Sequence, residues 1–209
     1  MSEAIEALLA EGRTFAPSDA FTSRSLVTDR SLHDQADADL EGFWAAQAEA
    51  LVDWYEPWEA VLEWDLPFSK WFVGGKLNVS YNCLDRHVAA GNGDKVAYHW
   101  EGEPGDTRTI TYAQLLDEVA RFANALKGLG VQKGDRVNIY MGMVPELPVA
   151  MLACARVGAP HSVVFGGFSA AALRDRIQDA EAKVLITQDE SHRGGNQIAL
   201  KQCADEAVA

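Results

Sequence analysis

The sequence has little cysteine, and its few cysteines are not arranged to cross-link the chain or to bind a metal. The three residues, Cys83, Cys154 and Cys203, lie far apart and form no C-x-x-C pair. An odd number of distant cysteines disfavours both a disulfide framework and a zinc site, and it is typical of a reducing compartment. We therefore expect a cytoplasmic protein.

Long apolar runs are also missing. The longest run, Leu147–Ala155, is followed by Arg156 and is too short to span a bilayer. The N-terminus has no basic segment followed by an apolar core, which a secretory signal would have. The sequence predicts no membrane partner and no export.

Basic residues are scarce, with 18 Lys and Arg against 31 Asp and Glu and a net charge of −13. The imbalance belongs to residues 1–65, which hold 15 acidic and 3 basic side chains, while the remainder is nearly neutral. Binding to nucleic acid requires clustered Lys and Arg, so we expect no nucleic-acid partner. The acidic front segment is expected to be a solvated surface that promotes solubility.

Several signatures of catalytic sites are absent. No two of the five histidines have metal-ligand spacing, there is no H-E-x-x-H motif, and the Walker pattern is missing. We expect no metal site in this chain. The acidic pair Glu101 and Glu103 falls in a predicted turn, where solvation is a simpler explanation than paired catalytic acids.

The composition that remains is that of a globular protein, with 48% hydrophobic and 9% aromatic residues. Residues 1–40 are polar and weakly periodic, and they predict an extended arm with a short helix near Ser2–Glu11. Residues 39–55 predict an amphipathic helix, and residues 56–82 read as loop-rich. A short helix is expected at Asn82–Ala90.

A regular alternation of strands and helices follows. Lys95–Trp100 and Thr107–Ile110 predict a hairpin, and Thr111 with Gln114 forms a capping box for the next helix. Strands are then predicted at Asp135–Met141, His161–Phe165 and Lys183–Thr187, with helices between them that begin near Pro145 and Ser169. This order indicates an α/β fold in which a parallel, doubly wound βαβαβ unit follows the acidic N-terminal segment.

The segment Phe165-Gly-Gly-Phe-Ser169 lies between a predicted strand and a helix N-terminus. In a doubly wound sheet this is the carboxyl edge, where ligands bind. The two glycines allow close approach to the backbone, and the helix offers unpaired N–H groups to an anion. A tight turn with Ser169 as an ordinary N-cap is the alternative. The spacing is not G-x-G-x-x-G, so a dinucleotide fingerprint is not indicated.

Ser169 also suggests a rival interpretation, because Gly167-x-Ser169-x-Ala171 differs by one residue from the nucleophile elbow of α/β-hydrolases. A hydrolase would need an acid and a histidine further along the chain. Only His192 follows, 23 residues later, which leaves too little chain for the intervening strands. We do not expect Ser169 to be a nucleophile.

A second glycine pair, in Arg193-Gly-Gly-Asn196, follows the third predicted strand. Glycines open the backbone, and a guanidinium can bind a phosphate through two hydrogen bonds, so a phosphate grip is one interpretation. A flexible surface loop with a solvated arginine is the other. A cluster of aromatics upstream is expected to be packing rather than a ligand box: Trp54, Trp58, Trp71, Phe72 and Tyr81.

The stretch PFSKWFVGGKLNVSYNCLDRH, Pro67–His87, resembles the N-terminal signature of the acetyl-CoA synthetases, which belong to the adenylate-forming ligase superfamily. The resemblance continues through Asp135–Met141, His161–Ser169 and Asp189–Gly195, and it covers the chain from about Phe43 onward. It implies that these 209 residues are the front third of an enzyme and the first part of a large N-terminal domain. The implied organisation is an arm at 1–40, a synthetase extension at 41–90 and the start of the AMP-binding domain at 91–209.

The resemblance implies an acetate–CoA ligase that uses ATP, with the help of Mg²⁺, to form an acetyl-adenylate, which coenzyme A then attacks. The nucleotide loop of that family is rich in Ser, Thr and Gly and ends in Lys, and no segment here matches it. We therefore expect no catalytic residue, ATP ligand or metal ligand within this chain. A propionate-specific or other short-chain acyl-CoA ligase, or a non-catalytic domain that binds coenzyme A, remain alternatives.

The resemblance also implies a binding site for the nucleotide part of coenzyme A. Phe165 and Gly167 match family positions that line this site. The loop Arg193, Gly194, Gly195 and Asn196 matches one that touches the nucleotide through basic residues at its first and fourth positions. Here the first position is Arg193, whereas the fourth, Asn196, departs from the pattern.

Overall fold

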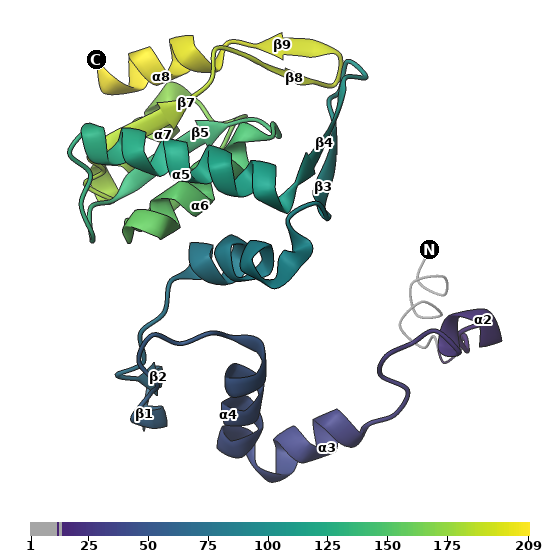
Figure 1. The fold of residues 1–209 in the computed structure, drawn as a ribbon. Coiled ribbons are helices and arrows are strands. Elements are labelled where there is room, and N and C mark those ends of the chain that lie inside the picture. Colours follow the sequence, from purple (N-terminus) through teal and green to yellow (C-terminus); the bar gives the residue numbers. More distant parts are fainter. Residues whose placement is uncertain (1–11, 13) are drawn as a thin grey trace, which may run out of the picture. The chain divides into compact units, whose positions relative to one another are not determined.

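The structure, a computed structural model, describes residue 12 and residues 14–209 (Figure 1). By its contacts the chain divides into two compact units. The first comprises residues 1–51 and 61–71, and the second comprises residues 52–60 and 72–209. The helix predicted near Ser2–Glu11 lies outside the described residues. The boundaries predicted at residues 40 and 90 stay predictions.

The first unit is built from short elements. Its helices are α2 (Asp19–Thr22), α3 (Ser31–Ala38) and α4 (Leu40–Leu51), and it contains most of the two-stranded sheet β1 (Ala60–Asp65) and β2 (Phe68–Val73). The amphipathic helix predicted at 39–55 is present but ends at Leu51. Beyond it, the backbone N–H and carbonyl of Asp53 both bond the Asn82 side chain, at 2.8 and 3.0 Å, and residues 52–54 are not helical.

The prediction that residues 56–82 are loop-rich was wrong for β1 and β2. Their segments are rich in Val, Trp and Phe, which favour strands, but each strand is only six residues long. The turn between them contains Leu66 and Pro67.

Aromatic side chains pack together in the second unit, as predicted for most of the cluster. The rings of Trp54, Trp58 and Phe72 lie 5.0 to 5.6 Å apart in tilted and edge-on pairs. Gly75 lies against this cluster, because a Cβ atom there would come within 2.5 Å of the Trp54 ring. The glycine is therefore required by packing.

The helix predicted at Asn82–Ala90 is present as two π-helical segments, η1 (Tyr81–Asp85) and η2 (Val88–Asn92). It is joined to the rest of the second unit by a fork of two hydrogen bonds from the Arg156 guanidinium to the Asp85 carboxylate, at 2.7 and 2.8 Å. This contact holds the pKa of Asp85 below its ordinary value, since the guanidinium stabilises the ionised carboxylate.

Asp85→Asn is expected to lower the free energy of unfolding by about 1–3 kcal/mol at pH 7, because it leaves a half-buried Arg156 without its charged partner. A carboxyl whose pKa is depressed in the folded state stabilises above its unfolded pKa, here about 3.8, and less as the pH falls through the folded value. The gap between wild type and variant should therefore shrink below pH 3.8 in urea titrations. Asp94→Asn, an exposed turn position, is the control.

The predicted hairpin is confirmed as β3 (Val96–Glu101) and β4 (Thr107–Thr111), which pair antiparallel. Helix α5 (Tyr112–Gly128) follows it directly. The capping box predicted from Thr111 and Gln114 is present in both directions, from side chain to backbone.

The parallel sheet predicted downstream is also confirmed. Its elements are β5 (Val137–Met141), α6 (Glu146–Val157), β6 (His161–Phe165), α7 (Ala170–Asp179) and β7 (Val184–Thr187). The strand order is β6-β5-β7, with β5 parallel to both neighbours. The chain thus steps to one side of β5 through α6 and crosses back to the other side through α7. Because each such crossover is right-handed, the two helices cover opposite faces of the sheet.

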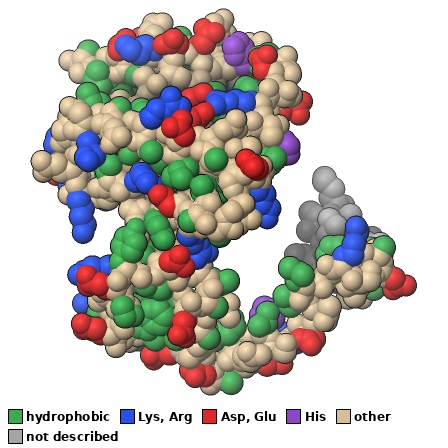
Figure 2. Space-filling view, in the orientation of Figure 1, with side chains coloured by type: hydrophobic (Ala, Val, Ile, Leu, Met, Phe, Trp, Pro, Cys, Tyr) green, Lys and Arg blue, Asp and Glu red, His purple; other side chains and the backbone are tan. Residues whose placement is uncertain are grey.

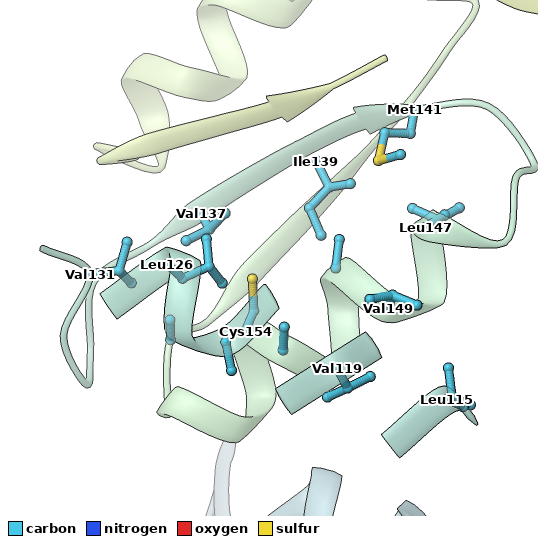
Figure 3. Close-up of a cluster of buried hydrophobic side chains, with 14 of the residues drawn as sticks. Leu115, Val119, Leu126, Val131, Val137, Ile139, Met141, Leu147, Val149 and Cys154 are labelled. Carbon is cyan, nitrogen blue, oxygen red and sulfur yellow. The ribbon is translucent and has the colours of Figure 1, made fainter. Parts of the chain in front are cut away.

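Strand β5 is buried along its whole length because helices cover both of its faces (Figure 1). Val137, Ile139 and Met141 point toward α5 and α6, where they pack against the buried side chains of those helices (Figure 3). Tyr140 points to the other face, against α7 and the C-terminal helix α8 (Leu200–Val208). This three-layer arrangement fixes the carboxyl end of β5 between its two neighbours.

Three C-terminal elements were not predicted from the sequence. After β7 the chain forms a small antiparallel hairpin, β8 (Ser191–Arg193) and β9 (Asn196–Ile198), and then α8. Three-residue strands are too short to show a period in the sequence. Helix α8 buries Leu200, Ala204 and Ala207 at helical spacing.

Candidate functional site

The loops at the carboxyl edge of the sheet form the candidate site. The loop after β5 leads to α6 on one face, and the loop after β6 leads to α7 on the opposite face. Two adjacent strands with connections that leave in opposite directions make a topological switch point, where open α/β sheets bind ligands. The Gly142 amide donates to the Gln188 side chain at 2.8 Å, which links the loop after β5 to the chain after β7.

The loop Phe165–Ser169 is fixed to the sheet by a hydrogen bond from Tyr140 of β5. The Tyr140 hydroxyl donates to the carbonyl of Phe168 at 2.8 Å and lies 3.3 Å from the Cys203 sulfur. Burial, with Cys203 beside it, raises the pKa of Tyr140 well above its ordinary value, so the phenol stays neutral and keeps its proton for this bond. The support leaves the outer side of the loop exposed.

Two aromatic rings and two guanidinium groups lie together at this edge. Phe165 and Phe168 are 50% and 38% exposed, and their rings meet edge to face at 5.6 Å. Arg193 lies over the Phe165 ring at 4.7 Å, and Arg176 lies over the Phe168 ring at 4.4 Å. An exposed ring beside a guanidinium offers both a stacking surface and a phosphate donor.

The two glycines of the loop have different environments. A Cβ on Gly167 would come within 2.6 Å of the Phe165 ring, whereas a Cβ on Gly166 would meet Met141 oxygen at 3.4 Å. Gly167 is therefore required if Phe165 is to keep its position beneath Arg193, and Gly166 is less constrained.

The segment Arg193–Asn196 is the tight turn of the β8–β9 hairpin. Arg193 pairs with Asn196 in the ladder, and both central glycines have positive φ, 58° for Gly194 and 73° for Gly195. This is the two-residue turn that glycine pairs favour. The Asn196 side chain donates to the Gly194 carbonyl at 3.2 Å, and the Gly195 amide donates to Glu103 at 2.7 Å. The segment is thus an ordered turn rather than a flexible loop.

Ser169 serves as the N-cap of α7. Its hydroxyl oxygen accepts a hydrogen bond from the Ala172 amide at 3.3 Å. His192 is in strand β8, and no hydrogen bond links it to Ser169. Ser169 is thus an N-cap, which was the alternative to a ligand-binding role in the sequence analysis.

The structure brings Phe165, Gly167 and the turn residues Arg193, Gly194, Gly195 and Asn196 to the same edge of the sheet. Sequence reasoning missed Arg176 and Glu103 as members of this region. Arg176 lies two helical turns from Phe168, a spacing common to any surface helix. Glu103 lies 92 positions from Gly195, and no local pattern marks that pairing.

In the described part of the chain, no three His, Cys, Asp or Glu side chains group together in a way that could hold a metal ion. No helix within the described residues is both long and apolar enough to cross a membrane. On the face shown in Figure 2, Lys and Arg side chains of the second unit are interspersed with Asp and Glu.

Comparison with known proteins identifies the family. The profile described as "AMP-binding enzyme" matches residues 85–208, more than half of the chain. The chain belongs to the AMP-binding enzyme family. A second profile, described as "Acetyl-coenzyme A synthetase N-terminus", matches residues 29–83 directly before it. The resemblance seen in the sequence is thereby confirmed, and the doubly wound sheet is the first part of a domain of this family.

Curated relatives share more than half of their aligned residues with this chain. It is 59% identical over 197 residues to an acetyl-coenzyme A synthetase of Rubrobacter xylanophilus, an alignment that covers 94% of this chain and 30% of the relative. It is 59% identical over 208 residues to the synthetase of Streptomyces coelicolor, covering 99% of this chain and 32% of the relative. The chain thus spans about a third of the length of these members of the family.

Proposed function

We propose that the protein containing this chain makes acetyl-CoA from acetate, ATP and coenzyme A, through an acetyl-adenylate and with release of AMP and pyrophosphate. The observation that carries this proposal is the 59% identity to relatives named acetyl-coenzyme A synthetase. The adjoining profile match to the N-terminus of such synthetases supports it. Its partners would be these small molecules, in the cytoplasm.

Within this function the described residues would bind the nucleotide part of coenzyme A. The exposed Phe165 ring can contact the adenine, and the Arg193 guanidinium over it can pair with a phosphate. Arg193 has no ion pair in the described part of the chain, so a phosphate would not have to displace a carboxylate from it. Gly167 keeps the backbone under the ring free of side-chain atoms.

ATP and Mg²⁺ would neutralise and transfer charge in the adenylation step. We assign neither group a ligand among the described residues, because no suitable carboxylate cluster and no nucleotide loop occur there. The contribution of this chain is thus the sheet, the helices that hold its edge, and one wall of the coenzyme A site.

The test is an assay of the complete gene product with acetate, propionate and butyrate, in which thioester and AMP formation are both measured. We expect acetate to have the highest kcat/KM, by about tenfold or more over propionate, since an acyl pocket sized for acetate excludes the extra methylene of propionate, and discrimination by one methylene is typically about 10- to 200-fold. A preference for propionate would favour the related ligase. Coenzyme A binding without AMP formation would indicate a non-catalytic binding domain.

A further inference from the structure

The β3–β4 hairpin reaches from the helical layer to the candidate site. Its first strand is fixed to the loop after β5 by two side chains. The Trp100 indole N–H donates to the Met143 carbonyl at 2.7 Å, and the Tyr98 hydroxyl donates to the Pro145 carbonyl at 3.2 Å. These bonds fix the direction in which the turn at the hairpin end points. That turn meets the β8–β9 hairpin (Figure 1).

The contact between the two hairpins is made by a carboxylate. Oε1 of Glu103 accepts a hydrogen bond from the backbone amide of Gly195 at 2.7 Å. In a two-residue hairpin turn the amides of the central residues point away from the ladder, so they are free to bind an anion. One of the two central amides of the glycine turn is therefore already occupied by a negative charge from the same chain.

The turn does not depend on Glu103 for its shape. The ladder pairs Ser191 with Ile198 and Arg193 with Asn196, and both glycines adopt left-handed backbone conformations. The Asn196 side chain adds a hydrogen bond inside the turn, to the Gly194 carbonyl. The Glu103 contact is thus an addition to a turn that local interactions already fix.

We propose that Glu103 is an internal anion that competes with a ligand phosphate for the Gly194–Gly195 turn and so limits the affinity for coenzyme A, an inference that rests on the proposed function. A single Gly195 amide cannot serve both acceptors at full strength. A carboxylate next to the turn also repels an incoming phosphate, while Arg193 attracts it. Glu103 therefore tunes affinity downward, which favours release of the nucleotide.

The test compares variants that separate charge from hydrogen bonding. Glu103→Gln removes the charge but keeps an oxygen acceptor, and Glu103→Ala removes both. Glu101→Gln is the matched control, since Glu101 is an exposed acid on the same hairpin, paired with Thr107 in the ladder, and its side chain has no hydrogen bond or ion pair in the described part of the chain. Coenzyme A dissociation constants of the complete gene product are measured by calorimetry.

We expect both Glu103 variants to bind coenzyme A about two- to fivefold more tightly, the range expected of one exposed charge, and Glu101→Gln to bind as wild type does. Weaker binding by Glu103→Ala would mean that Glu103 supports the turn, and the proposal would be overturned. Unchanged binding by both Glu103 variants, or an equal gain with Glu101→Gln, would overturn it as well.

Failure of the proposed function gives a different pattern. If wild-type protein does not bind coenzyme A, the competition is measured with inorganic pyrophosphate, through the NMR resonance of the Gly195 amide. Glu103→Gln should then shift that resonance at lower pyrophosphate concentration than wild type does. No difference between the two proteins, or no shift in either, would overturn the competition itself.

Discussion

Replacing Arg193 by alanine is expected to raise the Michaelis constant for coenzyme A by about 10- to 150-fold in the complete gene product. Loss of a charge-assisted phosphate contact costs roughly 1.5–3 kcal/mol, and 1.4 kcal/mol is a tenfold change in affinity. Arg193 is exposed, so screening places the result toward the low end of this range. The Phe165 ring also loses the guanidinium that lies 4.7 Å above it.

The proposed adenylation step provides the internal control, because it would involve ATP and acetate but not coenzyme A. Acetate-dependent exchange of pyrophosphate into ATP should therefore stay close to wild type in Arg193→Ala. Arg174→Ala removes an exposed arginine from α7 that forms an ion pair with its neighbour Asp175, and it should leave both reactions unchanged. If Arg193→Ala slowed exchange as much as thioester formation, Arg193 would be structural and the assignment to coenzyme A would fail.

Asn196→Arg belongs to the same series and should act in the opposite direction. Asn196 occupies the position where the resemblance leads us to expect a second basic residue, and its amide is used within the turn, on the Gly194 carbonyl. A guanidinium at position 196 would add a second phosphate donor directly across the hairpin from Arg193, its ladder partner. The Michaelis constant for coenzyme A is expected to fall below the wild-type value in Asn196→Arg. It is measured in the same assay as Arg193→Ala, for which the constant should rise.

The sheet was predictable because its signal is local. Val137, Ile139 and Met141 are apolar residues at every second position, and they form one buried face of strand β5. The capping box at Thr111 and the N-cap at Ser169 mark where two helices begin. Each of these features lies within a few residues of the element that it predicts. The parallel order then followed from the alternation of strand and helix.

The parts that could not be predicted depend on short strands or on contacts between distant residues. Strands β8 and β9 have three residues each, too few to show a period, so their turn was read as a loop. The Glu103 carboxylate was read as solvated because the partner that it finds, Gly195, lies 92 positions away. Only the fold brings the two hairpins together.

The residues predicted from the sequence for the site lie at one edge of the sheet. The contacts between their side chains could be seen only in the structure. Spacing alone favoured a solvated loop for Arg193 over a phosphate grip. The stacking on Phe165 now gives the guanidinium a fixed position, and the Phe165 ring explains the glycine at 167. The assignment of this edge to coenzyme A stays a proposal that the Arg193 series tests.

Residues 1–209 expressed alone are expected to give no acetate-dependent exchange of pyrophosphate into ATP above background. Adenylation requires a cradle of backbone amides, a metal ion and several cations around the triphosphate. No segment of this sequence matches a nucleotide loop, and the described residues hold no metal-binding cluster. The measurement is radiolabelled pyrophosphate exchange, with the complete gene product as the positive control.

The fold of the same preparation is checked by thermal unfolding, because we expect the isolated chain to be only marginally stable, and a negative exchange result counts only for folded protein. Exchange above background from the pure chain would contradict this division of labour. It would mean that the described residues contain an ATP site whose residues neither the sequence pattern nor the sheet-edge geometry identifies.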